Sequence, residues 1–455
     1  MASVYPDSHY ATGYASDVAE ETAPIAATPY WLHPFFLVVC CLGLPALVTY
    51  LLPAAVFESE WHTPKVYDTE NALSIAYAIA AFAAGMLVCW FWKQHSARSG
   101  YVGEEFPGLL VRGDWMRGVF LVCAGLTLMG SAVWAIYSAQ QGVGLGDAVA
   151  ALRGDSEAVM RIRAKAATIP GITTFTQMGM AASILAGLLW FRDNAFTVRG
   201  LFIVIVIAAF LRAFLRAERL AFIEVIVPFG VALLPSLIAR WRSVAFRMLL
   251  WFVPLIAVVA LIAFFIIAEA GRSYASKREA GLERGAVDYG ANRIGGYYGT
   301  ALNNGAFLLD TLPPARMPYF TLEWFWKFPG LPFIDGREMT GFNSDQLYAS
   351  LASDMNIEFN NTSGIFCYEY DFGRTGLVVV AFFCGAAAFL VFRSYRRGGG
   401  AGLIFYPICV LAFMELARIP YLTSKRAFAS VAVLLALVAF DKLLRISAQM
   451  KSRIY

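Results

Sequence analysis

Charged residues are scarce in this sequence, and its cysteines lack the spacing that disulfide-rich or metal-binding domains use. Only 15% of the 455 residues are Asp, Glu, Lys or Arg, whereas a soluble protein carries about 25%. The formal net charge of +4 is too small to indicate nucleic-acid binding. The seven cysteines form no CxxC pair and no Cys/His cluster with metal-ligand spacing. We therefore expect neither a disulfide framework nor a metal site or cofactor.

The first 30 residues contain neither Lys nor Arg, although they contain several acids and prolines. A secretory signal peptide needs a basic segment followed at once by an apolar core, so this segment is not one. We interpret residues 1–30 as a disordered tail.

Long apolar runs make up most of the remaining chain, which is 59% apolar and has a mean hydropathy of +0.60. A helix crosses a bilayer with about 20 mainly apolar residues, so we predict an all-α polytopic membrane protein with about ten transmembrane helices. The expected spans are 31–52, 71–92, 118–138, 171–191, 199–214, 217–238, 247–268, 374–393, 402–417 and 427–445.

The distribution of Lys and Arg predicts that both termini lie in the cytoplasm. With the N-terminus inside, the inner loops carry clusters such as Arg240 and Arg242, and the first outer loop carries only Lys65. The chain then divides into a cytoplasmic tail at 1–30, seven spans in 31–268, an outer loop at 269–373, three spans in 374–445 and a cytoplasmic tail at 446–455.

Three outer segments break this rule because they are also rich in arginine: 139–170, the turn at 212–219, and the loop at 269–373. An arginine near the bilayer centre costs roughly 2.5–3.5 kcal/mol on insertion scales. Arg212, Arg216 and Arg219 are spaced i, i+4, i+7, which places them on one helix face. Guanidinium groups pair with phosphate oxygens in a bidentate way, so this stripe favours a lipid headgroup or a polyprenyl diphosphate. A misplaced span or ordinary snorkelling is the alternative.

Other arginines flank the outer ends of the spans and could converge on the same anion. They are Arg272, Arg278, Arg293, Arg374 and Arg418. Preplaced cations at a water-poor site stabilise a diphosphate at the moment it leaves a sugar. Because no outer loop carries a DxD motif, we expect a site that works without a metal.

A sugar transfer also needs a base, or an acceptor hydroxyl held in line. The long loop contains no histidine, so carboxylates are the candidates. The candidate catalytic acids are Glu218, Asp371 and Glu415, and Glu224, Glu269, Glu358 and Glu369 are further acids in the same segments. Any of these acids could instead only neutralise an arginine. The candidate glycan-binding residues are Tyr297, Tyr298, Asn303, Asn360 and Asn361, whose alternative role is loop structure.

The end of the long loop, NNTSGIFCYEYDFGRTG, resembles the Wzy-type polymerases, which assemble O-antigen, capsule or exopolysaccharide from repeat units. The resemblance is carried by Asn361, Thr362, Asp371, Phe372, Gly373 and Gly376. The arginine-bearing turn at 212–219 is similar to the short outer turn of that family.

The resemblance implies a GT-C-like glycosyltransferase in the bacterial inner membrane. Such an enzyme transfers a glycan from undecaprenyl diphosphate to the next lipid-linked unit on the periplasmic side, with 269–373 as a large structured periplasmic loop. It implies that Arg216, Arg219, Arg272, Arg278, Arg293 and Arg418 hold diphosphates. The implied partners are the donor and acceptor lipids, membrane lipids and a chain-length regulator protein.

Three other functions stay open. An O-antigen ligase uses the same donor, but that family carries a functional histidine in its large outer loop. A flippase would have similar halves and a cationic central cavity. A scaffold of an export complex would leave the arginines at membrane depth without a purpose.

Overall fold

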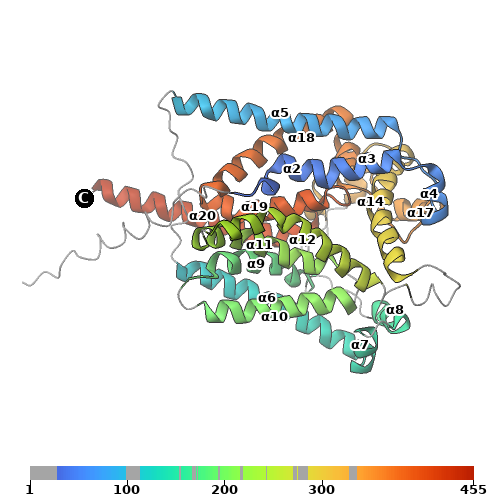
Figure 1. Cartoon of the computed structure of the whole chain (residues 1–455), viewed down its shortest axis with the longest axis horizontal. Coiled ribbons are helices and arrows are strands. Elements are labelled where there is room, and N and C mark those ends of the chain that lie inside the picture. The colour runs from blue at the N-terminus through green and yellow to red at the C-terminus, as the bar shows by residue number, and fades with distance from the viewer. Residues whose placement is uncertain are drawn as a thin grey trace, which may run out of the picture.

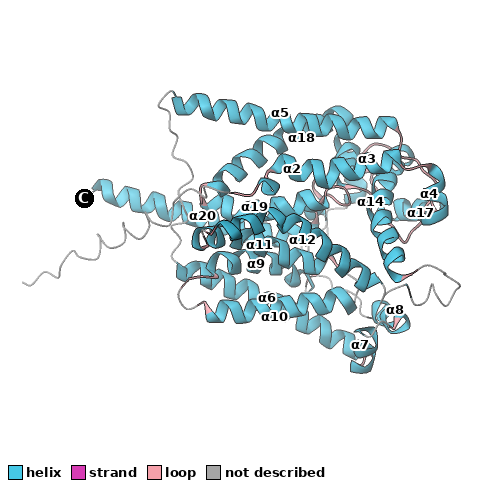
Figure 2. Ribbon diagram, viewed as in Figure 1, coloured by secondary structure: helices cyan, strands magenta, loops and turns pink. Residues whose placement is uncertain are grey.

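The computed structural model describes residues 28–98, 113–152, 155–165, 171, 173–192, 195–215, 219–241, 243–269, 274, 285–326 and 336–454. These residues form helices joined by loops and contain no strand (Figure 2), so the prediction of an all-α fold is confirmed. The interpretation of 1–30 as a disordered tail falls mostly outside the described residues.

Within the described residues, eight helical segments are long and apolar enough to cross a membrane. This fits a multi-pass membrane protein. The first is a composite of α2 (Pro34–Val38), a π-helical turn η2 (Val39–Gly43) and α3 (Leu44–Leu51). The others are α5 (Thr69–Arg98), α6 (Gly113–Gln140), α10 (Phe196–Leu215), α11 (Leu220–Arg240), α12 (Val244–Glu269), α18 (Gly364–Arg396) and α20 (Lys425–Ile454).

The two remaining predicted spans correspond to shorter apolar helices. The span expected at 171–191 is a 3-10 turn η3 (Thr173–Met178) followed by α9 (Gly179–Leu189), and the span expected at 402–417 is α19 (Gly400–Glu415). All but one of the α9 residues are buried. Helix α9 packs against α6, α10, α11, α19 and α20. The apolar run of α9 is therefore explained by burial among helices.

Elements from the predicted outer segments gather at one end of the bundle. Helices α4 (Ala54–Trp61), α7 (Leu145–Leu152), α8 (Ser156–Lys165), α14 (Ala286–Thr311) and α17 (Ser344–Asp354) lie at the right of Figure 1, opposite the end where the C-terminus is marked. The predicted tail at 446–455 continues α20 as helix to Ile454.

The segment predicted as one large loop is largely helical where it is described. Besides α14 and α17 it contains the short helices α15 (Glu323–Trp326) and α16 (Gly336–Thr340). Its last ten residues belong to α18, which begins at Gly364 because Ile365 and Phe366 pack into the apolar core against α5 and α14. The helix does not continue straight into the span predicted to start at 374. It is broken just before that residue, at Gly373, with φ 68° and ψ 174°.

Candidate functional site

Three of the predicted diphosphate-binding arginines meet around one tyrosine ring. Tyr297 lies on α14, one turn after Arg293, whereas Arg219 is the N-cap of α11 and Arg418 follows α19. The guanidinium carbons of Arg219, Arg293 and Arg418 lie 5.4, 5.5 and 5.7 Å from the Tyr297 ring centroid. A cation held near an aromatic ring is stabilised by the negative face of the ring. We call these four residues the Tyr297 cluster.

Two further aromatic rings pack against the Tyr297 cluster. The Arg219 guanidinium lies 3.6 Å from the centroid of Phe265, and that of Arg293 lies 4.3 Å from Phe359. Both phenylalanines meet Tyr297 edge to face, at 5.3 and 5.2 Å between centroids. This aromatic packing fixes the guanidinium groups without neutralising them.

Two carboxylates balance part of this charge. Arg293 Nη1 donates to Glu358 Oε2 at 2.8 Å, and Arg418 Nη1 donates to Glu415 Oε2 at 3.0 Å. Burial lowers the pKa of Arg418, but the Glu415 carboxylate together with Tyr298 and Tyr297 raises it, and the net result is a pKa above the usual value. Arg418 Nε is buried and has no hydrogen-bond partner among the described residues. Arg418 is therefore a fixed cation whose Nε–H donor makes no hydrogen bond to the described residues.

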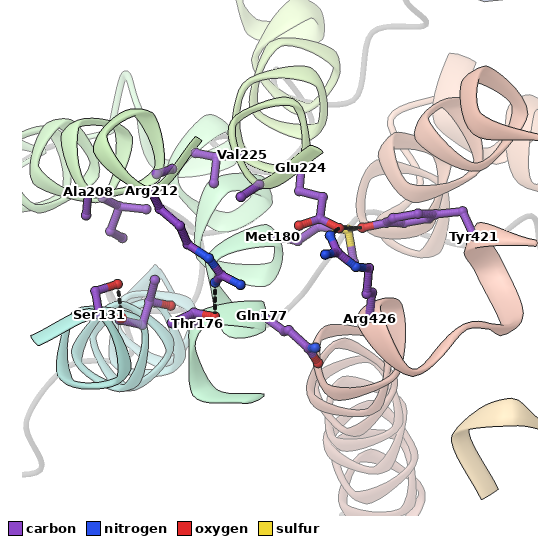
Figure 3. Close-up of a pocket in the computed structure, with 14 residues that line it drawn as sticks. Ser131, Thr176, Gln177, Met180, Ala208, Arg212, Glu224, Val225, Tyr421 and Arg426 are labelled. Atoms are coloured by element: carbon purple, nitrogen blue, oxygen red, sulfur yellow. Dashed lines mark hydrogen bonds and ion pairs between the residues drawn. The ribbon is translucent and has the colours of Figure 1, made fainter. Parts of the chain in front are cut away.

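A cavity of about 50 Å³ lies beside this cluster. Its polar lining comprises Thr127, Ser131, Thr176, Gln177, Arg212, Glu224, Tyr421 and Arg426 (Figure 3). Arg212 Nη1 donates to Thr176 Oγ1, and Arg426 Nη1 lies 3.3 Å from Glu224 Oε1. Arg212 is thus placed in this cavity, apart from the Tyr297 cluster.

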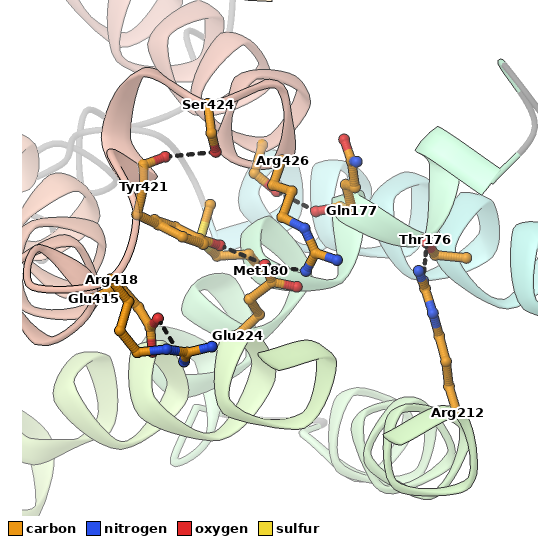
Figure 4. Close-up of polar contacts among 11 residues, drawn as sticks. Thr176, Gln177, Met180, Arg212, Glu224, Glu415, Arg418, Tyr421, Ser424 and Arg426 are labelled. Carbon is orange, nitrogen blue, oxygen red and sulfur yellow. Dashed lines mark hydrogen bonds and ion pairs between the residues drawn. The ribbon is translucent and has the colours of Figure 1, made fainter. Parts of the chain in front are cut away.

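Tyr421, in the 3-10 turn η5 (Tyr421–Thr423), connects the cavity to the cluster. Its hydroxyl donates to Glu224 Oε1 at 3.0 Å, and it lies three residues after Arg418 (Figure 4). Burial and the Glu224 carboxylate hold the pKa of Tyr421 well above its usual value. Tyr421 therefore stays protonated and acts as a donor.

Two predicted site residues are bound mainly by backbone groups. Asp371 Oδ1 accepts from the amides of Tyr319 and Phe320 at 2.8 and 3.2 Å, and Oδ2 accepts from the amide and hydroxyl of Thr321 at 2.7 and 2.8 Å. These bonds favour an anchoring role for Asp371, and its catalytic role stays a prediction from the sequence.

Asn303 is in the same situation and is fully buried. Its Oδ1 accepts from the amides of Val66 and Tyr67, and its Nδ2 donates to the Pro64 carbonyl. These three hydrogen bonds and its full burial favour a structural role for Asn303, and its glycan-binding role stays a prediction.

The other predicted residues are dispersed. Arg374 Nη2 and Nε each lie 3.4 Å from a carboxylate, Glu70 on α5 and Glu369 on α18 respectively, rather than in the Tyr297 cluster. Asn360 is exposed, and the Asn361 carbonyl accepts from Asn304 at 3.2 Å. Burial and the Glu415 carboxylate raise the pKa of Tyr298.

Some predictions are not addressed by the structure, and one residue of the site was not anticipated. Arg216, Glu218, Arg272 and Arg278 lie outside the described residues. Arg426 was not among the sequence candidates, although its position at the start of α20, at the predicted outer end, is the same violation of the positive-inside rule that marked the other arginines.

Comparison of the chain with protein-family models, with curated proteins and with solved structures gave no match. A function is therefore inferred from the residues of the chain itself.

Proposed function

We propose that this protein is a GT-C-like membrane glycosyltransferase that polymerises undecaprenyl-diphosphate-linked repeat units into a bacterial surface polysaccharide. The observation that supports this best is the Tyr297 cluster, in which three arginines far apart in the sequence surround one ring. Guanidinium groups pair with phosphate oxygens in a bidentate way, so a group of three favours the binding of an anion such as a diphosphate. The transfer takes place on the periplasmic side of the inner membrane, with both termini in the cytoplasm.

The arginines hold the diphosphate of the lipid donor and stabilise the charge that develops as the glycosidic bond breaks. Guanidinium groups already in place do this without reorganisation, which is the main advantage of such a site. Tyr297 orients the arginines through its ring, and Glu415 holds Arg418 in place. No metal is needed in this scheme, and membrane lipids and a chain-length regulator are the expected partners.

The position of Arg219 and Arg418 at helix ends favours a glycosyltransferase over a transporter of the lipid-linked unit. Arg219 caps the beginning of α11, and Arg418 follows the end of α19. A transporter binds its cargo near the membrane midplane, between two similar halves. Cations at helix ends fit a reaction at the membrane boundary better.

A strain lacking the gene tests the proposal. Undecaprenyl-linked glycans and surface polysaccharide would be measured by mass spectrometry. We expect single repeat units to accumulate and long polymer to disappear. Long lipid-linked polymer that remains unattached would indicate a ligase, and single units trapped on the inner leaflet would indicate a flippase.

The Arg219→Ala variant tests the role of the cluster in the same strain. Loss of one preorganised charge donor typically lowers turnover by about 10²–10³-fold, so we expect chain growth to stop while the protein still inserts. Arg161→Ala is the matched control, since Arg161 is an arginine at the same end of the bundle whose side chain is 42% exposed and paired with Asp147 and Glu157. Normal chain lengths in an Arg216→Ala, Arg219→Ala double variant would contradict the proposed role.

A further inference from the structure

We infer that Glu224 is the general base that deprotonates the acceptor hydroxyl in the proposed glycosyl transfer. This inference rests on the proposed function and adds the proton acceptor that the function requires. It assigns the step to a carboxylate that lines the cavity, rather than to Asp371 or Glu415.

The described carboxylates of the site differ in what their oxygens can still accept. Asp371 accepts four hydrogen bonds from one loop, and the Glu415 side chain is 4% exposed and paired with Arg418. Glu224 is the described carboxylate that lines the cavity. It is therefore the acid that a bound hydroxyl would reach.

Glu224 is held in a way that leaves one oxygen available. The Tyr421 hydroxyl and Arg426 Nη1 both bind Oε1, at 3.0 and 3.3 Å. Since both described hydrogen bonds end on Oε1, Oε2 can accept a proton from a bound hydroxyl. A base oriented by a second group is the usual arrangement for general-base catalysis.

The remaining cavity wall suits a sugar acceptor. Thr127, Ser131 and Gln177 supply neutral polar groups, and Arg212 is bound to Thr176 across the cavity from Glu224 (Figure 4). The ionisable groups that face Glu224 are Arg212 on α10, Tyr421 on η5 and Arg426 on α20. The arginines are cations and Tyr421 is protonated, so none of the three competes with Glu224 as a base.

The reaction step balances with these groups alone. The acceptor hydroxyl gives its proton to Glu224 Oε2, and its oxygen forms a bond to the anomeric carbon of the donor sugar. The bond between that carbon and the diphosphate oxygen breaks, and its electron pair stays on the diphosphate, beside the arginines of the Tyr297 cluster. Glu224 later loses the proton to water.

The test uses the full chain in proteoliposomes, with the lipid-linked units that accumulate in the gene-deletion strain as substrate. The rate of formation of the two-unit product is measured by mass spectrometry. We expect Glu224→Gln to lower kcat by about 10²–10⁴-fold with little change in KM. Glu224→Asp should keep part of the activity, and added formate should restore part of the activity of Glu224→Ala. Glu157→Gln, which removes an exposed carboxylate paired with Arg161, is the control expected to be unchanged.

The outcomes separate the inference from the proposed function. If the deletion strain still makes normal polymer, the proposed function is wrong. If deletion stops the polymer but Glu224→Gln works at the wild-type rate, only the assignment of the base is overturned. The same assignment is overturned if formate fails to restore activity to Glu224→Ala. If Glu224 variants do not accumulate in membranes, Tyr421→Phe decides the question. Tyr421→Phe removes the hydrogen bond from the Tyr421 hydroxyl to Glu224. Loss of this bond should lower kcat about fivefold with KM unchanged, and an unchanged kcat would contradict the inference.

Discussion

At the residue scale, neighbours within one helix could be predicted from the sequence, whereas neighbours from distant segments could not. Arg293 and Tyr297 are spaced i, i+4 on α14, so their neighbourhood could be read from the sequence once the helix was known. Asp371 could not be read in this way, because its partners lie about fifty residues earlier in the chain. An acid in a functional-looking motif can be either a catalyst or an anchor, and only its partners distinguish the two roles.

Asp371→Ala tests the anchor role. The substitution leaves the buried amide of Tyr319 and the partly buried amides of Phe320 and Thr321 without an acceptor, and loss of a buried partner costs about 1–3 kcal/mol. We expect a lower melting temperature in detergent and faster proteolysis near residues 313–326. Turnover per folded molecule should stay close to that of the wild type. Asp354→Asn, at an exposed position in α17, is the control. A stable Asp371→Ala protein without turnover would restore the catalytic interpretation.

At the scale of elements, glycine determines how closely two spans approach. A Cβ on Gly85 of α5 would overlap the carbonyl oxygen of Phe382 on α18, and a Cβ on Gly385 of α18 would overlap that of Phe82 on α5. The contact is thus reciprocal, and small residues allow it, as in other helix pairs within membranes. The sequence shows these glycines inside apolar runs but does not show which helix each one faces.

Gly85→Ala tests this packing. Because the obstacle is backbone rather than a flexible side chain, α5 and α18 must move apart. Overpacking of this kind costs about 1–3 kcal/mol, so we expect a lower melting temperature and less folded protein. Gly125→Ala on α6 is the matched control, because a Cβ there meets no atom within 4 Å. Equal melting temperatures for the two variants would show that the close approach of α5 and α18 is not required.

At the scale of the whole molecule, the two ends of the bundle differ. The end opposite the marked C-terminus holds the helices of the predicted outer segments (Figure 1). Helix α18 runs from that end to the other, where Arg397 follows it. Because α14 carries Arg293 and Tyr297, the Tyr297 cluster lies toward the end of the bundle that holds the predicted outer segments.

Labelling of single cysteines determines which face this is. Ser353→Cys at the end of α17 and Arg397→Cys after α18 are both exposed. With a membrane-impermeant maleimide and intact spheroplasts, we expect Ser353→Cys to react above the level of the parent protein. Arg397→Cys should react only after permeabilisation. The reverse pattern would place the cluster in the cytoplasm and exclude transfer on the periplasmic side.

The sequence by itself determined that the chain is a helical membrane protein and which arginines are costly there. Apolar runs and charges are local properties, so span positions and unusual arginines can be read residue by residue. Only the tertiary structure decided that Arg219, Arg293 and Arg418 meet at Tyr297 while Arg374 pairs elsewhere. It also placed Glu224 beside Tyr421 and Arg426, which lie 197 and 202 residues later in the chain. Such neighbours depend on how helices pack, and one-dimensional spacing carries no information about packing between distant helices.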